Sequence, residues 1–259
     1  MVKRTFQSLL VACLVTGAVR AANDPFVGKW KLNPSKSTLT DEMKVEAVGL
    51  NKYAFDFGGG NPVTVVADGT QQPANFGTTM SVAFEDPNTW KFVGKKDDRI
   101  GSTATWRLSE DGKTLSDAFT VYQPNGSKLQ LDYVYKRTTP GSGFVGTWES
   151  TSEKVDSVYE VQIQPYEGGG LSFINPAQEA TTNIKFDGKD YATVGPNVPA
   201  GSVSCGSRVS ESTLEITDKM KDKVTSTRQL RLSADLKTLT VTVHPVGRSK
   251  PNILVFDRE

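Results

Sequence analysis

The sequence predicts an all-β protein whose main part contains two copies of one antiparallel domain. Two observations indicate this fold class: a long internal repeat, and an alternation of apolar and polar residues in both copies. Turn dipeptides such as Asn125-Gly126 separate the alternating runs, as tight hairpins require. Apolar residues do not recur at helical spacing over three turns, so helix should be a minor component.

The repeat is visible in two separate segments. Phe26-Val27-Gly28-Lys29-Trp30 recurs 118 residues later as Phe144-Val145-Gly146-Thr147-Trp148. Segments 103–115 and 227–239 share eight of 13 residues at an offset of 124, where ordinary composition gives about one match. The change in offset indicates insertions and deletions in surface loops, which tolerate them.

Within each copy the local pattern has a period of two. Met80, Val82 and Phe84 alternate with polar neighbours, and Leu230 and Leu232 do the same in the second copy. Successive side chains of a strand point to opposite faces, so one set faces a core and the other faces solvent. About nine short strands per copy favour a meandering antiparallel barrel or sandwich.

The repeat also sets the predicted domains. Residues 138–143, rich in Thr, Gly and Ser, have the composition of a linker. The domains should then span residues 25–139 and 144–259. A repeat this long indicates two closed domains in tandem, because solenoid units recur every ~20–50 residues.

Residues 1–21 are predicted to be a signal peptide. Lys3 and Arg4 precede an apolar stretch, and cleavage is expected after Ala21. The protein should therefore be exported, to the periplasm or outside the cell. As an alternative, the residues ending at Cys13 resemble a lipobox, which would make the chain a lipoprotein anchored through Cys13. No segment is apolar enough over ~20 residues to predict a membrane span.

Charge and chemistry-bearing residues exclude several functions. Removal of Lys3, Arg4 and Arg20 from the 30 basic residues leaves 27 against 29 acidic residues, which argues against a nucleic-acid partner. His244 is the only histidine, and only Cys205 would remain after cleavage, so neither a zinc site nor a disulfide is expected. Glycine-rich nucleotide-binding motifs are also missing. We therefore predict no catalytic residue, no metal and no cofactor.

The ends of each copy carry the motifs of a known family. A G-x-W motif with Trp30 or Trp148 opens each copy, and Arg137 or Arg258 closes its last strand. In this the chain resembles the lipocalin-like (calycin) β-barrel family. The repeated hairpin with Asp-Gly-Lys-Thr-Leu at 111–115 also resembles uncharacterised lipocalin-like bacterial envelope proteins. The resemblance implies two tandem lipocalin-like antiparallel β-barrels. It also implies that, within each copy, the arginine packs over the tryptophan and closes one barrel end.

Aromatic residues on the alternating faces are the candidates for ligand binding. They are Tyr53, Phe55, Phe57, Trp90, Phe92, Trp106 and Tyr133. In a barrel of ~8–10 strands such residues either fill the interior or line a cavity for one small ligand.

The leading hypothesis is non-enzymatic binding of a small hydrophobic molecule. The alternatives are an envelope structural or interaction module with solidly packed barrels, and a calycin-like enzyme. Buried Asp or Glu side chains with perturbed pKa beside a pocket would support the enzyme.

Overall fold

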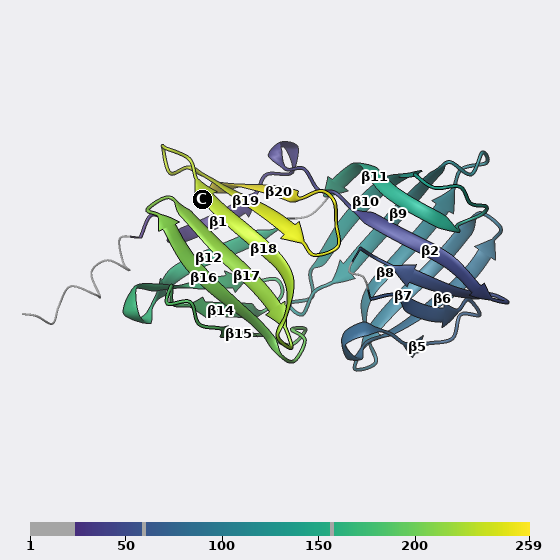
Figure 1. The fold of residues 1–259 in the computed structure, drawn as a ribbon, viewed down its shortest axis with the longest axis horizontal. Helices are drawn as coiled ribbons and strands as arrows, with labels where there is room; N and C mark the ends of the chain where they lie inside the picture. Colours follow the sequence, from purple (N-terminus) through teal and green to yellow (C-terminus); the bar gives the residue numbers. More distant parts are fainter. Residues whose placement is uncertain (1–23, 59–60, 156–157) are drawn as a thin grey trace, which may run out of the picture.

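The computed structural model describes residues 24–58, 61–155 and 158–259. Over these residues the chain forms twenty strands and three 3₁₀ turns, arranged in two antiparallel barrels side by side (Figure 1). This confirms the predicted all-β class and the two antiparallel barrels. No helix in the described part of the chain is long and apolar enough to cross a membrane. The predicted signal peptide (1–21) and Cys13 lie outside the described residues.

The first barrel is a ten-stranded sheet in the order β4-β3-β2-β11-β10-β9-β8-β7-β6-β5. Its strands are β2 (Glu42–Gly49), β3 (Lys52–Asp56), β4 (Val63–Val66), β5 (Gln72–Pro73), β6 (Thr79–Asp86), β7 (Thr89–Lys96), β8 (Arg99–Leu108), β9 (Thr114–Tyr122), β10 (Lys128–Arg137) and β11 (Gly146–Val155). Two 3₁₀ turns, Pro34–Lys36 and Asn75–Gly77, belong to the first repeat.

The second barrel is closed, and all its neighbouring strands are antiparallel. Its strands are β1 (Gly28–Leu32), β12 (Glu160–Tyr166), β13 (Gly170–Asn175), β14 (Ala180–Ile184), β15 (Tyr191–Val194), β16 (Ser202–Ser210), β17 (Thr213–Met220), β18 (Lys223–Leu232), β19 (Thr238–Pro245) and β20 (Asn252–Arg258). The third 3₁₀ turn is Glu167–Gly169.

The two repeats exchange their first strands. β1 pairs with β12 and β20 of the second barrel, while β11 pairs with β2 and β10 of the first. Figure 1 shows β1, in purple, among the green and yellow strands, and β11 beside β2. The ranges 25–139 and 144–259 therefore delimit the sequence repeats, whereas each barrel takes its first strand from the other repeat. The exchange is possible because both strands carry the same F-V-G-x-W sequence.

A side chain joins the two edge strands of the first barrel. The Val66 amide donates to Gln72 Oε1 (2.8 Å), and Gln72 Nε2 donates back to the Val66 carbonyl (2.7 Å). The side-chain amide of Gln72 thus takes the place of a backbone peptide group between β4 and β5, because it offers the same donor and acceptor. Nearby, the Gly69 amide donates to the Val82 carbonyl at 2.8 Å.

In the second barrel, Trp30 and Arg258 lie directly opposite each other on β1 and β20. The guanidinium carbon of Arg258 lies 4.1 Å from the centroid of the indole, which is fully buried. Arg258 donates to the carbonyls of Pro25 (2.5 Å), Val27 (2.7 Å) and Leu236 (2.7 Å). Cation–π attraction and these hydrogen bonds together close this end of the barrel.

The first barrel ends in the same way, with Trp148 on β11 and Arg137 on β10. The guanidinium carbon lies 4.3 Å from the indole centroid, and Arg137 donates to the carbonyls of Gly112 (2.9 Å), Gly143 and Val145. Each arginine covers a tryptophan, as the resemblance implies. The tryptophan comes from the other repeat, however, because the first strands are exchanged.

Candidate functional site

The first barrel encloses a cavity of about 550 Å³, a volume typical of small-molecule sites. Apolar side chains cover much of its wall, among them Met43, Phe57, Met80, Phe92, Trp106 and Phe119. Phe57 directly follows β3, and the other five come from β2, β6, β7, β8 and β9, because every second residue of a strand points inward.

The structure divides the seven predicted aromatic residues into two groups. Phe57, Phe92, Trp106 and Tyr133 line the cavity. Tyr53, Phe55 and Trp90 pack in the core beside it. The Tyr53 and Trp90 ring centroids lie 4.8 Å apart, and the Phe55 ring packs edge-on against Trp106 at 6.0 Å. The second group supports the wall and does not face the cavity.

The second barrel holds a smaller cavity of about 240 Å³. Strand register explains the difference in volume. Gly94 and Ala104 lie where the second repeat has Asp218 and Arg228. Arg228 lines the second cavity and forms an ion pair with Asp218, with Nη2 2.6 Å from Oδ1. A long charged side chain thus occupies space that a methyl group leaves open in the first barrel.

A buried carboxyl group faces the first cavity. Asp117 on β9 is only 7% exposed and lines the cavity between Trp106 on β8 and Tyr133 on β10, its direct cross-strand neighbours. The Trp106 indole donates a hydrogen bond to this carboxylate. Among the described residues, however, Asp117 Oδ1 has no hydrogen-bond partner. Burial raises the pKa of Asp117 to about 7, with smaller contributions from the charges of Asp41 and Asp132 and against the hydrogen bond from Trp106, which lowers it.

A second carboxyl group lies in the same row of cross-strand neighbours, which runs from Trp106 through Asp117 and Tyr133. Glu153 on β11 lies opposite Tyr133, and burial raises its pKa to about 7. Its Oε1 accepts a hydrogen bond from Ser150 Oγ at 2.9 Å. Burial also raises the pKa of Tyr133 above its ordinary value, so this phenol stays neutral between the two acids.

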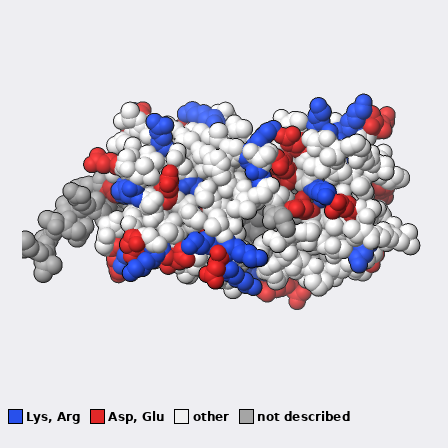
Figure 2. All heavy atoms as spheres, viewed as in Figure 1, with Lys and Arg blue, Asp and Glu red and all other residues white. Residues whose placement is uncertain are grey.

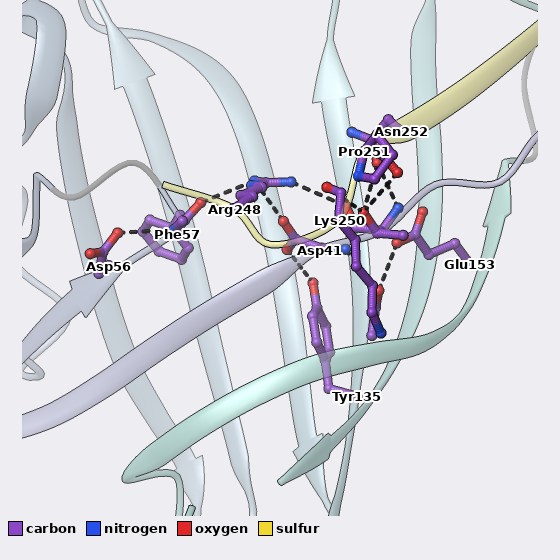
Figure 3. Close-up of polar contacts among 12 residues, drawn as sticks. Asp41, Asp56, Phe57, Tyr135, Glu153, Arg248, Lys250, Pro251 and Asn252 are labelled. Carbon is purple, nitrogen blue, oxygen red and sulfur yellow. Dashed lines mark hydrogen bonds and ion pairs between the residues drawn. The ribbon is translucent and has the colours of Figure 1, made fainter. Parts of the chain in front are cut away.

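A loop of the second barrel reaches the edge of the first cavity (Figure 3). Arg248, between β19 and β20, lines this cavity and places Nη2 2.6 Å from Asp41 Oδ1. It also donates to the carbonyls of Thr40 (3.1 Å) and Phe57 (3.0 Å). Tyr135 Oη donates to the other oxygen of Asp41 at 2.7 Å. The site in the first barrel is therefore completed by the second.

Glycine is required where this loop meets the first barrel. Gly58 has φ +81°, and a Cβ there would lie 2.6 Å from Arg248 Nε and 2.9 Å from the Glu42 carbonyl oxygen. The neighbouring Ser249 and Lys250 bond to Glu42 and Glu149 of the first barrel. These contacts hold Arg248 against Asp41.

Two aromatic rings of the cavity wall are also exposed to solvent. Phe57 is 41% and Phe76 57% exposed. Phe76 has the left-handed backbone conformation, with φ +60°, which is costly for a bulky residue. Because they both line the cavity and meet solvent, these rings form an apolar mouth.

Several residues of this site were not predicted from the sequence. Asp117 carried a usable signal, because it lies between Leu115 and Phe119 in an alternating run and so had to face inward. Asp41 lies just before β2, and Arg248 lies in a loop of the second barrel but contacts the first. Neither residue is part of an alternating run that would have predicted its place in the site.

The described residues contain no group of three or more His, Cys, Asp or Glu side chains that could hold a metal ion. On the face drawn in Figure 2, acidic and basic side chains are intermingled over both barrels. No protein-family model matches the chain, and no curated protein sequence matches it.

Proposed function

We propose that the protein is an exported, lipocalin-like carrier that binds one small, largely apolar molecule in the first barrel. The cavity of about 550 Å³ and its aromatic wall support this function. The volume is well above the roughly 300 Å³ below which drug-sized ligands are rarely held. The second cavity, about 240 Å³, falls below that value, so the second repeat contributes the loop with Arg248 and the strand β11 to a site in the first barrel.

Binding is tested with the neutral fluorescent probe N-phenyl-1-naphthylamine. We expect micromolar affinity and a change in tryptophan emission, because Trp106 lies in the cavity wall. Ala104→Leu should weaken binding at least tenfold by filling the cavity, and the equivalent position already carries Arg228 in the second barrel. Ala180→Leu fills the second cavity instead and is the matched control. Equal affinity of all three proteins would contradict binding in the first barrel.

Export is tested by mass spectrometry of the mature N-terminus. Cleavage after Ala21 should leave a chain that begins at Ala22. An acylated N-terminus at Cys13 would show instead that the protein is a lipoprotein anchored through Cys13. A chain that retains residues 1–21 would contradict export.

An enzyme of calycin-like fold is the second candidate, because Asp117 is a buried acid beside a cavity with its pKa raised to about 7. Such groups are suited to proton transfer near neutral pH. The two candidates differ in the fate of the bound molecule. A carrier releases it unchanged, whereas an enzyme converts it, and Asp117→Asn would stop the conversion. Mass spectrometry of the recovered ligand separates the two.

A further inference from the structure

We propose that the first cavity selects a hydrophobic amine, whose ammonium group pairs with Asp117 while its apolar part lies against the aromatic wall. This inference rests on the proposed function, since it names the chemical class of the molecule that the cavity binds.

One carboxylate oxygen of Asp117 lacks a partner in the cavity. Asp117 is more than nine-tenths buried and lines the cavity, and its Oδ1 has no hydrogen-bond partner among the described residues. A buried polar group without a partner costs about 1–3 kcal/mol, and more when it is charged. A ligand that donates a hydrogen bond at this point would remove that cost.

The fold does not need an acid at the position of Asp117. In the second barrel the equivalent residue is Val241, which pairs with Leu230 and Leu254 on the neighbouring strands. Asp117 pairs in the same way with Trp106 and Tyr133. One barrel thus has an entirely aliphatic row where the other has an indole, a carboxyl and a phenol. The polar row is a property of the first cavity and not of the barrel.

The charge of the cavity wall also favours a cationic ligand. Its ionisable groups include the carboxyls of Asp41 and Asp117 and one guanidinium, that of Arg248. Arg248 is already paired with Asp41, and Glu153 lies one strand beyond Tyr133. Tyr133 and Tyr135 are neutral, because burial raises their pKa values. The wall therefore has an excess of negative charge, which attracts an ammonium group and repels a fatty-acid carboxylate.

The aromatic wall favours the same ligand class. Trp106, Phe92 and Tyr133 line the cavity with Asp117. A cation over such rings gains about 0.5–2 kcal/mol when it is shielded from water. The apolar part of the ligand would lie against Met43, Met80 and Phe119, which are also in the wall.

Three probes with one ring system test the inference by isothermal titration calorimetry at pH 8: 1-naphthylmethylamine, 1-naphthalenemethanol and 1-naphthoic acid. The amine should bind at least tenfold more tightly than the alcohol, and the acid should bind most weakly. Asp117→Asn should reduce the affinity for the amine at least tenfold and leave that for the alcohol within threefold. Asp132→Asn, an exposed neutralisation on the adjacent strand, is the matched control and should keep the preference for the amine.

The unmodified protein provides a second test that does not depend on the variant folding. Asp117 loses its proton near pH 7, with Asp41, Asp132 and Glu153 as its charged neighbours. The affinity for the amine should therefore rise about tenfold between pH 5.5 and pH 8, while that for the alcohol should stay constant. A flat profile, or an alcohol or acid that binds as tightly as the amine, would overturn the inference and leave the proposed function standing. If none of the three probes nor the neutral dye binds, the proposed function itself fails.

Discussion

Replacement of Trp30 by alanine is expected to destabilise the barrel of the second repeat, although Trp30 belongs to the first. The indole is fully buried between β12 and β20, its N–H donates to the Phe26 carbonyl at 2.9 Å, and Arg258 covers its face. Large-to-small changes at buried tryptophans cost about 3–5 kcal/mol. The loss here includes the cation–π contact and leaves Arg258 without the surface on which it packs.

Hydrogen exchange followed by mass spectrometry locates this effect. Amides of β12 and β20 should lose protection by a factor of about 100 or more, while those of β2 and β10 should change little. Trp148→Ala is the matched variant and should give the reverse pattern, because Trp148 lies on β11 between β2 and β10. Loss of protection in β2 and β10 caused by Trp30→Ala would show that β1 folds into the barrel of its own repeat.

The strand exchange marks the limit of what this sequence predicts about its fold. The alternating runs and turn dipeptides depend on local geometry, and they correctly predicted two antiparallel all-β copies. That each copy forms a barrel came from the resemblance. Which barrel receives β1 depends on whether residues 33–41 turn back or cross to the other barrel. Both first strands carry F-V-G-x-W, so the local sequence fits either barrel equally well. The pairing of Trp30 with Arg258 follows from that choice alone.

The cavity was partly predictable for a related reason. Inward aromatic residues follow from the period of two, but a hollow interior depends on which side chains meet across the barrel. Ala104 leaves space that Arg228, paired with Asp218, fills in the other barrel. These residue types are visible in the sequence, but their equivalent positions in the two barrels are known only from the strand register.

The exchange also links the two barrels mechanically. Each barrel lacks one strand without the other repeat, and Arg248 of the second barrel binds Asp41 at the edge of the first cavity. Loss of either first strand would break two ladders of hydrogen bonds in the receiving barrel. Each barrel therefore depends on the other repeat for its stability, and the ligand cavity depends on contacts from both repeats.

The protein is expected to become less stable as the pH rises from about 4 to 8. Asp117 has a pKa of about 7 in the folded chain against an ordinary value of 3.8. Between these values the folded state holds a proton that the unfolded state has lost, so the free energy of unfolding falls with rising pH. Asp117 alone should account for about 3 kcal/mol between pH 5 and pH 8. Glu153, whose pKa is also raised to about 7 by burial, acts in the same direction.

Other carboxyls do not cancel this trend, because their titration lies at lower pH. Hydrogen bonds at hairpin turns lower the pKa values of Asp68, Asp111 and Asp235, so their stabilising effect is lost only as the pH falls below about 4. Urea unfolding at pH 5 and pH 8 measures the difference. Asp117→Val, which copies Val241 of the second barrel, should remove about 3 kcal/mol of the pH dependence and leave the protein more stable at pH 8. An unchanged pH dependence in this variant would mean that Asp117 is charged and solvated in the folded chain, and its carboxylate would then have no need of a cationic ligand.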